Sequence, residues 1–140
     1  MKGIRMQGGI PLQGKVRIQG SKNAALPILA ATLLTNEVSY IQNCPRIADV
    51  HRFVHLLREL GCLVHWQEKG IRVQPGENEE LPCERAEARR MQGEAITGMR
   101  SSLCLLGALL GRCGYVTMEH PGGCIIGERP IDLHIRALQQ

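Results

Sequence analysis

The sequence contains an internal repeat, and this repeat limits the possible folds more than any other feature. Apolar residues recur at a spacing of 77: Leu26, Leu29, Ala31 and Leu33 match Leu103, Leu106, Ala108 and Leu110. The triplet Asp49-Val-His returns as Asp132-Leu-His, 83 residues later. A pattern that returns at a fixed period indicates a copied supersecondary unit. We therefore expect one structural unit followed by part of a second copy.

Each copy mixes strand and helix patterns, which predicts an α/β fold. Alternating apolar residues predict strands over 15–19, 38–41, 62–66, 70–74 and 115–118. Helical spacing predicts helices over 24–34, 46–60 and 94–110, with a further helix starting at Pro130. We expect Ser21 to be the N-cap of the first helix, Pro27 to fall near its first turn, and Gly61 to end the second.

The two spacings differ by about six residues, so the second copy carries an insertion before its last helix. This insertion lies within residues 120–129, which read His-Pro-Gly-Gly-Cys-Ile-Ile-Gly-Glu-Arg. Function often resides in a loop added to a repeated scaffold. The second copy also stops within its last helix, whose apolar face would have no partner. We therefore expect this chain to be the N-terminal part of a longer protein.

The composition is that of an ordinary globular domain. Of the 140 residues, 44% are hydrophobic and 21% are charged, which excludes a disordered chain. Only 3% are aromatic, so the core must consist of Leu, Ile, Val and Ala, and bases would find few rings to stack on. The net charge of +4 fits a small anionic ligand as well as nucleic acid. The scarcity of rings favours the small ligand.

Neither a membrane span nor a signal peptide is visible in the sequence. No apolar run reaches the ~20 residues needed to cross a bilayer, and the first nine residues, Met-Lys-Gly-Ile-Arg-Met-Gln-Gly-Gly, contain no long apolar stretch. We expect a cytoplasmic protein that binds neither nucleic acid nor a membrane.

The six cysteines lie at positions 44, 62, 83, 104, 113 and 124. Their spacing contains no Cys-x-x-Cys pair, which argues against a structural zinc site. A reducing compartment also argues against a disulfide framework. We expect Cys62, Cys104 and Cys113 to be small buried apolar residues, whereas Cys124 belongs to the inserted loop.

Two positions in the apolar helices could bind anions. Lys22 and Asn23 open the first long helix, where backbone N–H groups, the helix dipole and the lysine charge favour a phosphate or carboxylate. Such a lysine is more often solvated surface. Arg100 lies early in the third helix, and it either binds a ligand or extends its charge to the surface.

The inserted loop is the sharpest local feature. Cys124 follows two glycines and stands between His120 and Arg129. A cationic neighbourhood favours a reactive thiolate, and the same thiol in its protonated form can act as a general acid. An idle loop cysteine is the alternative. Asp132 follows in the first turn of the last helix, where it either contacts a ligand or caps that helix.

Three stretches together resemble a known enzyme family. These are Gly20-Ser-Lys-Asn-Ala-Ala-Leu-Pro, Thr97-Gly-Met-Arg-Ser-Ser and Pro121-Gly-Gly-Cys-Ile-Ile-Gly-Glu-Arg-Pro-Ile-Asp-Leu-His. They resemble the UDP-N-acetylglucosamine 1-carboxyvinyltransferases, which transfer the enolpyruvyl group of phosphoenolpyruvate to the 3′-hydroxyl of UDP-N-acetylglucosamine and release phosphate. The resemblance covers essentially the whole chain, and the sister enzyme of the shikimate pathway lacks the Pro-Gly-Gly-Cys loop that begins the last stretch.

The resemblance implies a role for each matched residue. Cys124 would protonate the methylene carbon of phosphoenolpyruvate, and it could form a covalent adduct. Lys22, Asn23 and Arg129 would bind phosphoenolpyruvate. The UDP-sugar would contact a second set, namely Arg100, Arg129, Pro130, Ile131, Asp132 and Leu133. No metal or organic cofactor is implied, and the only implied partners are the two small substrates.

The resemblance also implies an inside-out α/β barrel built of βαβαββ units. Residues 1–21 would supply the first strand of a second domain, and residues 22–140 would form about one and a half units of the catalytic domain. Two alternatives stay open. One is an enolpyruvyl transferase for another acceptor, such as shikimate 3-phosphate. The other is an inactive fragment that only binds nucleotide sugar, and we expect the 140-residue chain alone to be inactive.

Overall fold

The fold combines helices with short strands, as the α/β prediction requires. A computed structural model describes residues 3–74, 76, 90–91, 96, 102–118 and 131–139. In chain order the elements are α1 (Lys22–Ala31), the 3-10 helix η1 (Thr32–Leu34), β1 (Ser39–Gln42), α2 (Ala48–Glu59), β2 (Leu63–Gln67), β3 (Gly70–Gln74), β4 (Arg90–Met91), α4 (Leu103–Cys113), β5 (Thr117–Met118) and α5 (Asp132–Leu138).

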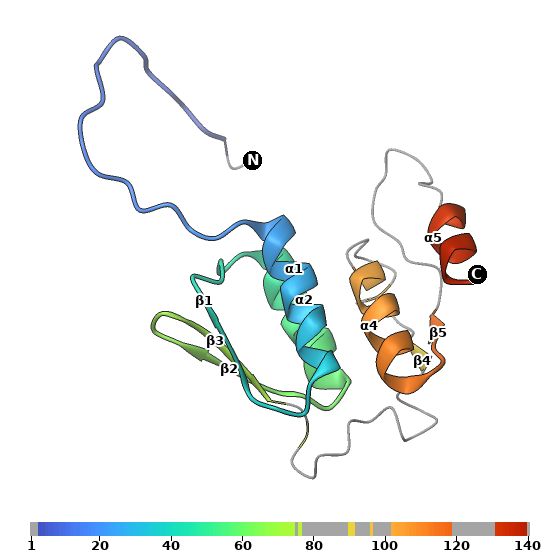
Figure 1. The fold of residues 1–140 in the computed structure, drawn as a ribbon. Helices are drawn as coiled ribbons and strands as arrows, with labels where there is room; N and C mark the ends of the chain where they lie inside the picture. Colours follow the sequence, from blue (N-terminus) through green and yellow to red (C-terminus); the bar gives the residue numbers. More distant parts are fainter. Residues whose placement is uncertain are drawn as a thin grey trace.

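An open three-stranded antiparallel sheet forms one layer of the first unit. Its strand order is β1-β3-β2, so β3 is central and β2 joins it through a tight hairpin. Ile41 of β1 pairs with Ile71 of β3, and Val64 of β2 pairs with Val73. Because side chains alternate along a strand, these residues share one face. Helices α1 and α2 lie side by side against this sheet (Figure 1).

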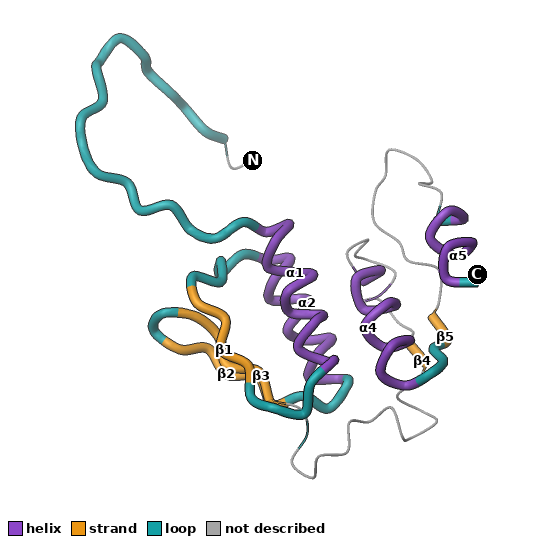
Figure 2. Tube along the Cα trace, in the orientation of Figure 1, coloured by secondary structure: helices purple, strands orange, loops and turns teal. Residues whose placement is uncertain are grey.

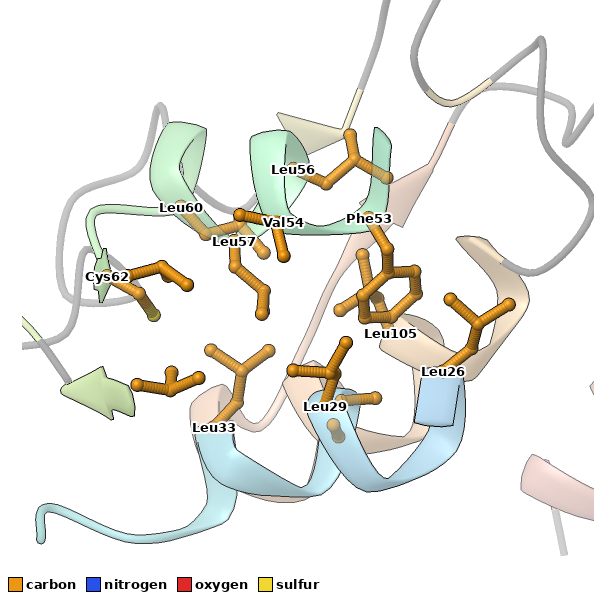
Figure 3. Packing of buried hydrophobic residues seen from close by; sticks show 14 of the residues in the cluster. Leu26, Leu29, Leu33, Phe53, Val54, Leu56, Leu57, Leu60, Cys62 and Leu105 are labelled. Carbon is orange, nitrogen blue, oxygen red and sulfur yellow. The ribbon is translucent and has the colours of Figure 1, made fainter. Parts of the chain in front are cut away.

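The core between the helices and the sheet is almost entirely aliphatic, as the composition predicts. Phe53 of α2 is the only aromatic residue among the fully buried side chains of the described chain. It lies opposite Leu29 of α1 and Leu105 of α4 (Figure 3). Leu33 and Leu57 extend the same cluster toward the strands. Burying such a side chain contributes about 1.5–3 kcal/mol, so this cluster holds the two helices and α4 together.

The ends of α1 and α2 follow from local sequence signals, with one correction. Ser21 occupies the N-cap of α1, although its side chain makes no capping hydrogen bond. Pro27 is the sixth residue of α1, not part of its first turn. Since proline has no N–H, α1 lacks the bond that this residue would donate to the Asn23 carbonyl. Gly61 ends α2 as predicted, with a positive φ of 89° and its N–H donating to the Arg58 carbonyl at 2.9 Å.

The predicted strand over 15–19 is not formed. This segment belongs to a long exposed stretch that Figure 2 draws as loop from residue 3 to α1. A strand needs a hydrogen-bonded neighbour, and no described strand pairs with residues 15–19. The segment is attached at its end, where the Gly20 N–H donates to the Asn43 carbonyl at 3.2 Å.

The second copy shares the element types of the first but buries a different face of its helix. Leu105 and Leu109 of α4 are buried, whereas Leu103, Leu106 and Leu110, which match the first copy, are only half-buried. The reason is that α4 packs against α1 and η1. Its own sheet consists, among the described residues, of the short parallel pair β4–β5. The sequence repeat therefore does not reproduce the burial pattern.

The remaining predictions of secondary structure hold in part. Helix α4 extends to Cys113, three residues past the predicted end, and Gly114 follows in the left-handed region with φ of 76°. Strand β5 and helix α5 lie within the predicted elements. The inserted loop over 120–129 lies outside the described residues.

Candidate functional site

The structure describes five of the nine predicted site residues. Lys22 and Asn23 begin α1, and both are exposed. Ile131, Asp132 and Leu133 lie at the start of α5. The other four predicted residues, Arg100, Cys124, Arg129 and Pro130, lie outside the described residues. The geometry reported below therefore concerns two helix starts and their surroundings.

An ion pair joins the starts of α1 and α2. The Lys22 Nζ atom lies 2.9 Å from Oδ2 of Asp49, which sits in the first turn of α2. Both side chains remain accessible, with 48% of the lysine and 34% of the aspartate side chain exposed. Arg52 lies one turn further along α2, with its Nη1 atom 4.0 Å from Oδ1 of Asp49. One carboxylate is therefore shared by two cations.

The position of this ion pair has an electrostatic consequence. Two helix N-termini meet there, and each carries unsatisfied N–H groups and the positive end of a dipole. Asp49 compensates this positive field in the absence of another anion. The Lys22 ammonium has three donors, so it can hold Asp49 and still donate to an incoming phosphate or carboxylate. The site is suited to an anion that enters from solvent.

The sequence did not predict the contact between Asp49 and Lys22. Asp49 stood out only as a member of the repeated Asp-x-His triplet. That triplet was the available signal, because an aspartate in the first turn of a helix is stabilised by the positive end of the helix dipole. The residues are 27 apart in the sequence, and the spacing alone gives no information about how α1 and α2 pack.

The start of α5 is separate from the Lys22 site. Figure 1 shows α5 beyond α4, away from the start of α1. None of the α5 residues is buried, and Leu133 is 70% exposed. Asp132 is the first residue of α5, and its side chain makes no hydrogen bond or ion pair to another described residue. The described residues thus do not bring the two halves of the predicted site together.

The chain matches a known family along nearly its whole length. A family described as EPSP synthase (3-phosphoshikimate 1-carboxyvinyltransferase) matches residues 6–140. The chain belongs to the EPSP synthase family.

Similar curated proteins in this family carry one name, UDP-N-acetylglucosamine 1-carboxyvinyltransferase. The protein from Methylacidiphilum infernorum is 41% identical over 140 residues, which cover 100% of this chain and 31% of the relative. Those from Coprothermobacter proteolyticus and Sorangium cellulosum are both 44% identical, over 138 and 139 residues, and each match covers 99% of this chain. These matches cover 30% and 31% of the relatives. This EPSP synthase family chain therefore spans about a third of the length of the relatives that it matches.

The described cysteines of this EPSP synthase family chain are packing residues and form no disulfide. Cys62 is buried, and Cys104 and Cys113 are partly buried against the core, which confirms their predicted role in part. Burial raises the pKa of the Cys44 and Cys104 thiols above their ordinary value of 9.0. Both thiols are therefore protonated near neutral pH, which makes them poor nucleophiles.

Two further features are absent from the described part of this EPSP synthase family chain. Its acidic, histidine and cysteine residues nowhere gather in a group of three that could hold a metal ion. Among the described helices, none is both long and apolar enough to span a bilayer.

Proposed function

We propose that this chain forms part of an enzyme that transfers the enolpyruvyl group of phosphoenolpyruvate to the 3′-hydroxyl of UDP-N-acetylglucosamine, releasing phosphate. The observation that carries this proposal is the identity of about 41% over the whole chain to proteins named for that reaction. This would be the first committed step of peptidoglycan synthesis, a cytoplasmic reaction needed for cell-wall growth, cell shape and division.

The proposed reaction needs cations for two anionic substrates. We assign Lys22, Asn23 and Arg129 to phosphoenolpyruvate. We assign Arg100 and the stretch Arg129, Pro130, Ile131, Asp132 and Leu133 to the UDP-sugar. The exposed ammonium of Lys22 at two helix starts supports its assignment, because a dianionic phosphate gains from both the charge and the dipoles.

The proposed chemistry is an addition followed by an elimination. Cys124 gives its thiol proton to the methylene carbon of phosphoenolpyruvate, the 3′-hydroxyl oxygen bonds to the adjacent carbon, and the hydroxyl proton passes to solvent. This yields a tetrahedral intermediate that still carries phosphate. The Cys124 thiolate then takes a proton back from the new methyl group, the carbon–oxygen bond to phosphate breaks, and inorganic phosphate departs and takes up a proton from solvent. Lys22 and Arg129 stabilise the phosphate as negative charge moves onto it.

We propose that the first unit belongs to a βαβαββ repeat in an inside-out barrel. The observed order α1-β1-α2-β2-β3 supplies the last five elements of such a unit. Residues 1–21 would then donate their strand to the second domain, while residues 22–140 belong to the catalytic domain. The exposure of residues 15–19, which have no partner strand among the described residues, is compatible with this assignment.

An acceptor comparison tests the proposed function. Phosphate release from phosphoenolpyruvate is measured with a protein of the relatives' length that contains this chain. We expect release with UDP-N-acetylglucosamine and none with shikimate 3-phosphate. The reverse preference would identify a transferase for the other acceptor. Binding of UDP-N-acetylglucosamine without phosphate release would favour a silent nucleotide-sugar-binding protein.

A further inference from the structure

A second cationic site lies away from Lys22, where three separate segments of the chain line an open surface cavity of about 350 Å³. The N-terminal segment contributes Arg17 and Ile18, the β1–α2 connection contributes Arg46, and the β2–β3 turn contributes Glu68 and Lys69. This volume lies at the lower end of the range for small-molecule sites, about 300–1,000 Å³. Lys22 does not line this cavity, so the site is distinct from the proposed phosphoenolpyruvate site.

Backbone contacts join the three segments at Asn43. The Asn43 N–H donates to the Lys69 carbonyl at 2.9 Å, and the Asn43 carbonyl accepts from Gly20 at 3.2 Å. The backbones of Gly20 and Asn43 lie close together, since a Cβ atom on Gly20 would lie 2.2 Å from the Asn43 carbonyl oxygen. Asn43 itself adopts a left-handed conformation with φ of 53°, which asparagine tolerates better than most residues. The walls of the cavity are therefore set by backbone geometry as well as by side chains.

The charges around this cavity do not balance. Three cations, Arg17, Arg46 and Lys69, face one carboxylate, Glu68, so the lining has a net formal charge of +2. Neither Arg17 nor Lys69 forms an ion pair with any residue in the described part of the chain. Cations from distant parts of the sequence that converge without counter-charges favour an anion between them.

Arg46 is the best-oriented of the three cations. Its Nη2 atom donates to the Gln67 carbonyl at 2.8 Å, and its guanidinium carbon lies 5.0 Å from the centre of the Trp66 ring. These contacts fix the side chain, yet they leave further N–H donors on the guanidinium fork. A pre-oriented arginine is the residue best suited to bind a phosphate with two parallel hydrogen bonds.

We propose that this cavity binds the phosphate group of a small ligand, either free inorganic phosphate or a compact organic phosphate. A dianion matches the net charge of +2. Ile18 and Cys44 add apolar surface for a short carbon chain, but no aromatic residue lines the cavity. The lining therefore favours a ligand without a nucleobase.

The only tryptophan of the sequence provides a local reporter. Because Arg46 both lines the cavity and lies over Trp66, an anion that engages Arg46 alters the emission of Trp66. The complete 140-residue chain is titrated at constant ionic strength with inorganic phosphate, with glycerol 3-phosphate and with glycerol. Melting temperature is a second readout, since a ligand that binds the folded state raises it. We expect saturable responses to both phosphates and none to glycerol.

Matched variants distinguish binding in this cavity from the general attraction between a positively charged chain and an anion. Arg17→Gln and Lys69→Gln each remove one wall charge, and we expect either change to raise the Kd for phosphate about tenfold or more. Lys15→Gln is the control, because it removes an equal charge two residues from Arg17 without touching the cavity. Equal affinity in all three variants and the unaltered chain would overturn the proposal, as would a lack of saturation. If glycerol 3-phosphate binds more tightly than inorganic phosphate, the ligand is a compact organic phosphate. If the two bind with equal affinity, the ligand is free inorganic phosphate.

Discussion

Lys22 and Asp49 form an ion pair that joins the first turns of α1 and α2, with 2.9 Å between the ammonium nitrogen and the carboxylate oxygen. The carboxylate lies where the proposed phosphate contact is formed, so Asp49 competes with an anion for the same ammonium. The pair is also partly exposed, which limits its contribution to folding.

We expect the pair to contribute little to stability and more to ligand binding. In a double-mutant cycle with Lys22→Ala and Asp49→Ala, urea unfolding should give a coupling energy of about 0.2–1 kcal/mol, because solvent screens exposed ion pairs. In an active full-length enzyme, Lys22→Ala should raise the KM for phosphoenolpyruvate at least about tenfold. An unchanged KM would remove Lys22 from the phosphate site.

Gly70 should tolerate no side chain. A Cβ atom there would lie 2.1 Å from the Ile41 carbonyl oxygen, which belongs to the backbone of the paired strand β1. Gly70→Ala must therefore displace β1 from β3, and we expect a loss of about 1–3 kcal/mol. Gly107→Ala is the matched control, since its Cβ would meet nothing within 4 Å on α4. That change should stabilise the chain by about 0.5–1 kcal/mol. Urea unfolding of both variants tests whether the free energy of unfolding falls in Gly70→Ala and rises in Gly107→Ala.

The packing cysteines should react with alkylating reagents more slowly than Cys124. Burial raises the pKa of Cys44 and Cys104, so their thiolate fraction, and with it their alkylation rate, should be low near pH 7 and reach half of its maximum only above pH 9. Cys124 should react rapidly at pH 7, and in the complete enzyme it should be the thiol modified by the epoxide phosphonate fosfomycin. Peptide mapping across a pH series tests this order. Preferential modification of Cys104 would contradict it.

Arg129 should be essential for turnover in an enzyme of full length. A charge-assisted contact to phosphate in a closed site contributes about 2–4 kcal/mol, so Arg129→Ala should reduce kcat/KM by roughly 1.5 to 3 orders of magnitude. Arg136→Ala is a suitable control, because Arg136 lies in the last turn of α5 and is exposed. Equal activities of the two variants would exclude Arg129 from the site.

Local signals in the sequence predicted the first unit well. The helix α2, its termination at Gly61 and the strands β2 and β3 all depend on residues close together in the chain, and each is confirmed. Four site residues remain predictions, because Arg100, Cys124, Arg129 and Pro130 lie outside the described residues.

Predictions that depend on distant neighbours were less successful. Residues 15–19 have the alternation of a strand but lack a partner strand in the described structure. Helix α4 buries Leu105 rather than Leu106, because contact with α1 and η1 determines which face is covered. The pairing of Asp49 with Lys22 likewise depends on how two helices pack, which periodicity does not specify.

The strand order β1-β3-β2 has a consequence for how the chain folds as it is synthesised. Among the described strands, β1 pairs only with β3, whose residues emerge about 30 positions later. The β2–β3 hairpin closes locally, so its turn can form within microseconds of emergence. Strand β1, in contrast, must wait for β3 while its backbone groups remain bonded to water. Folding of this unit on the ribosome is therefore complete only after Gln74 has left the exit tunnel, so β1 is the last strand to join although it is the first to be made.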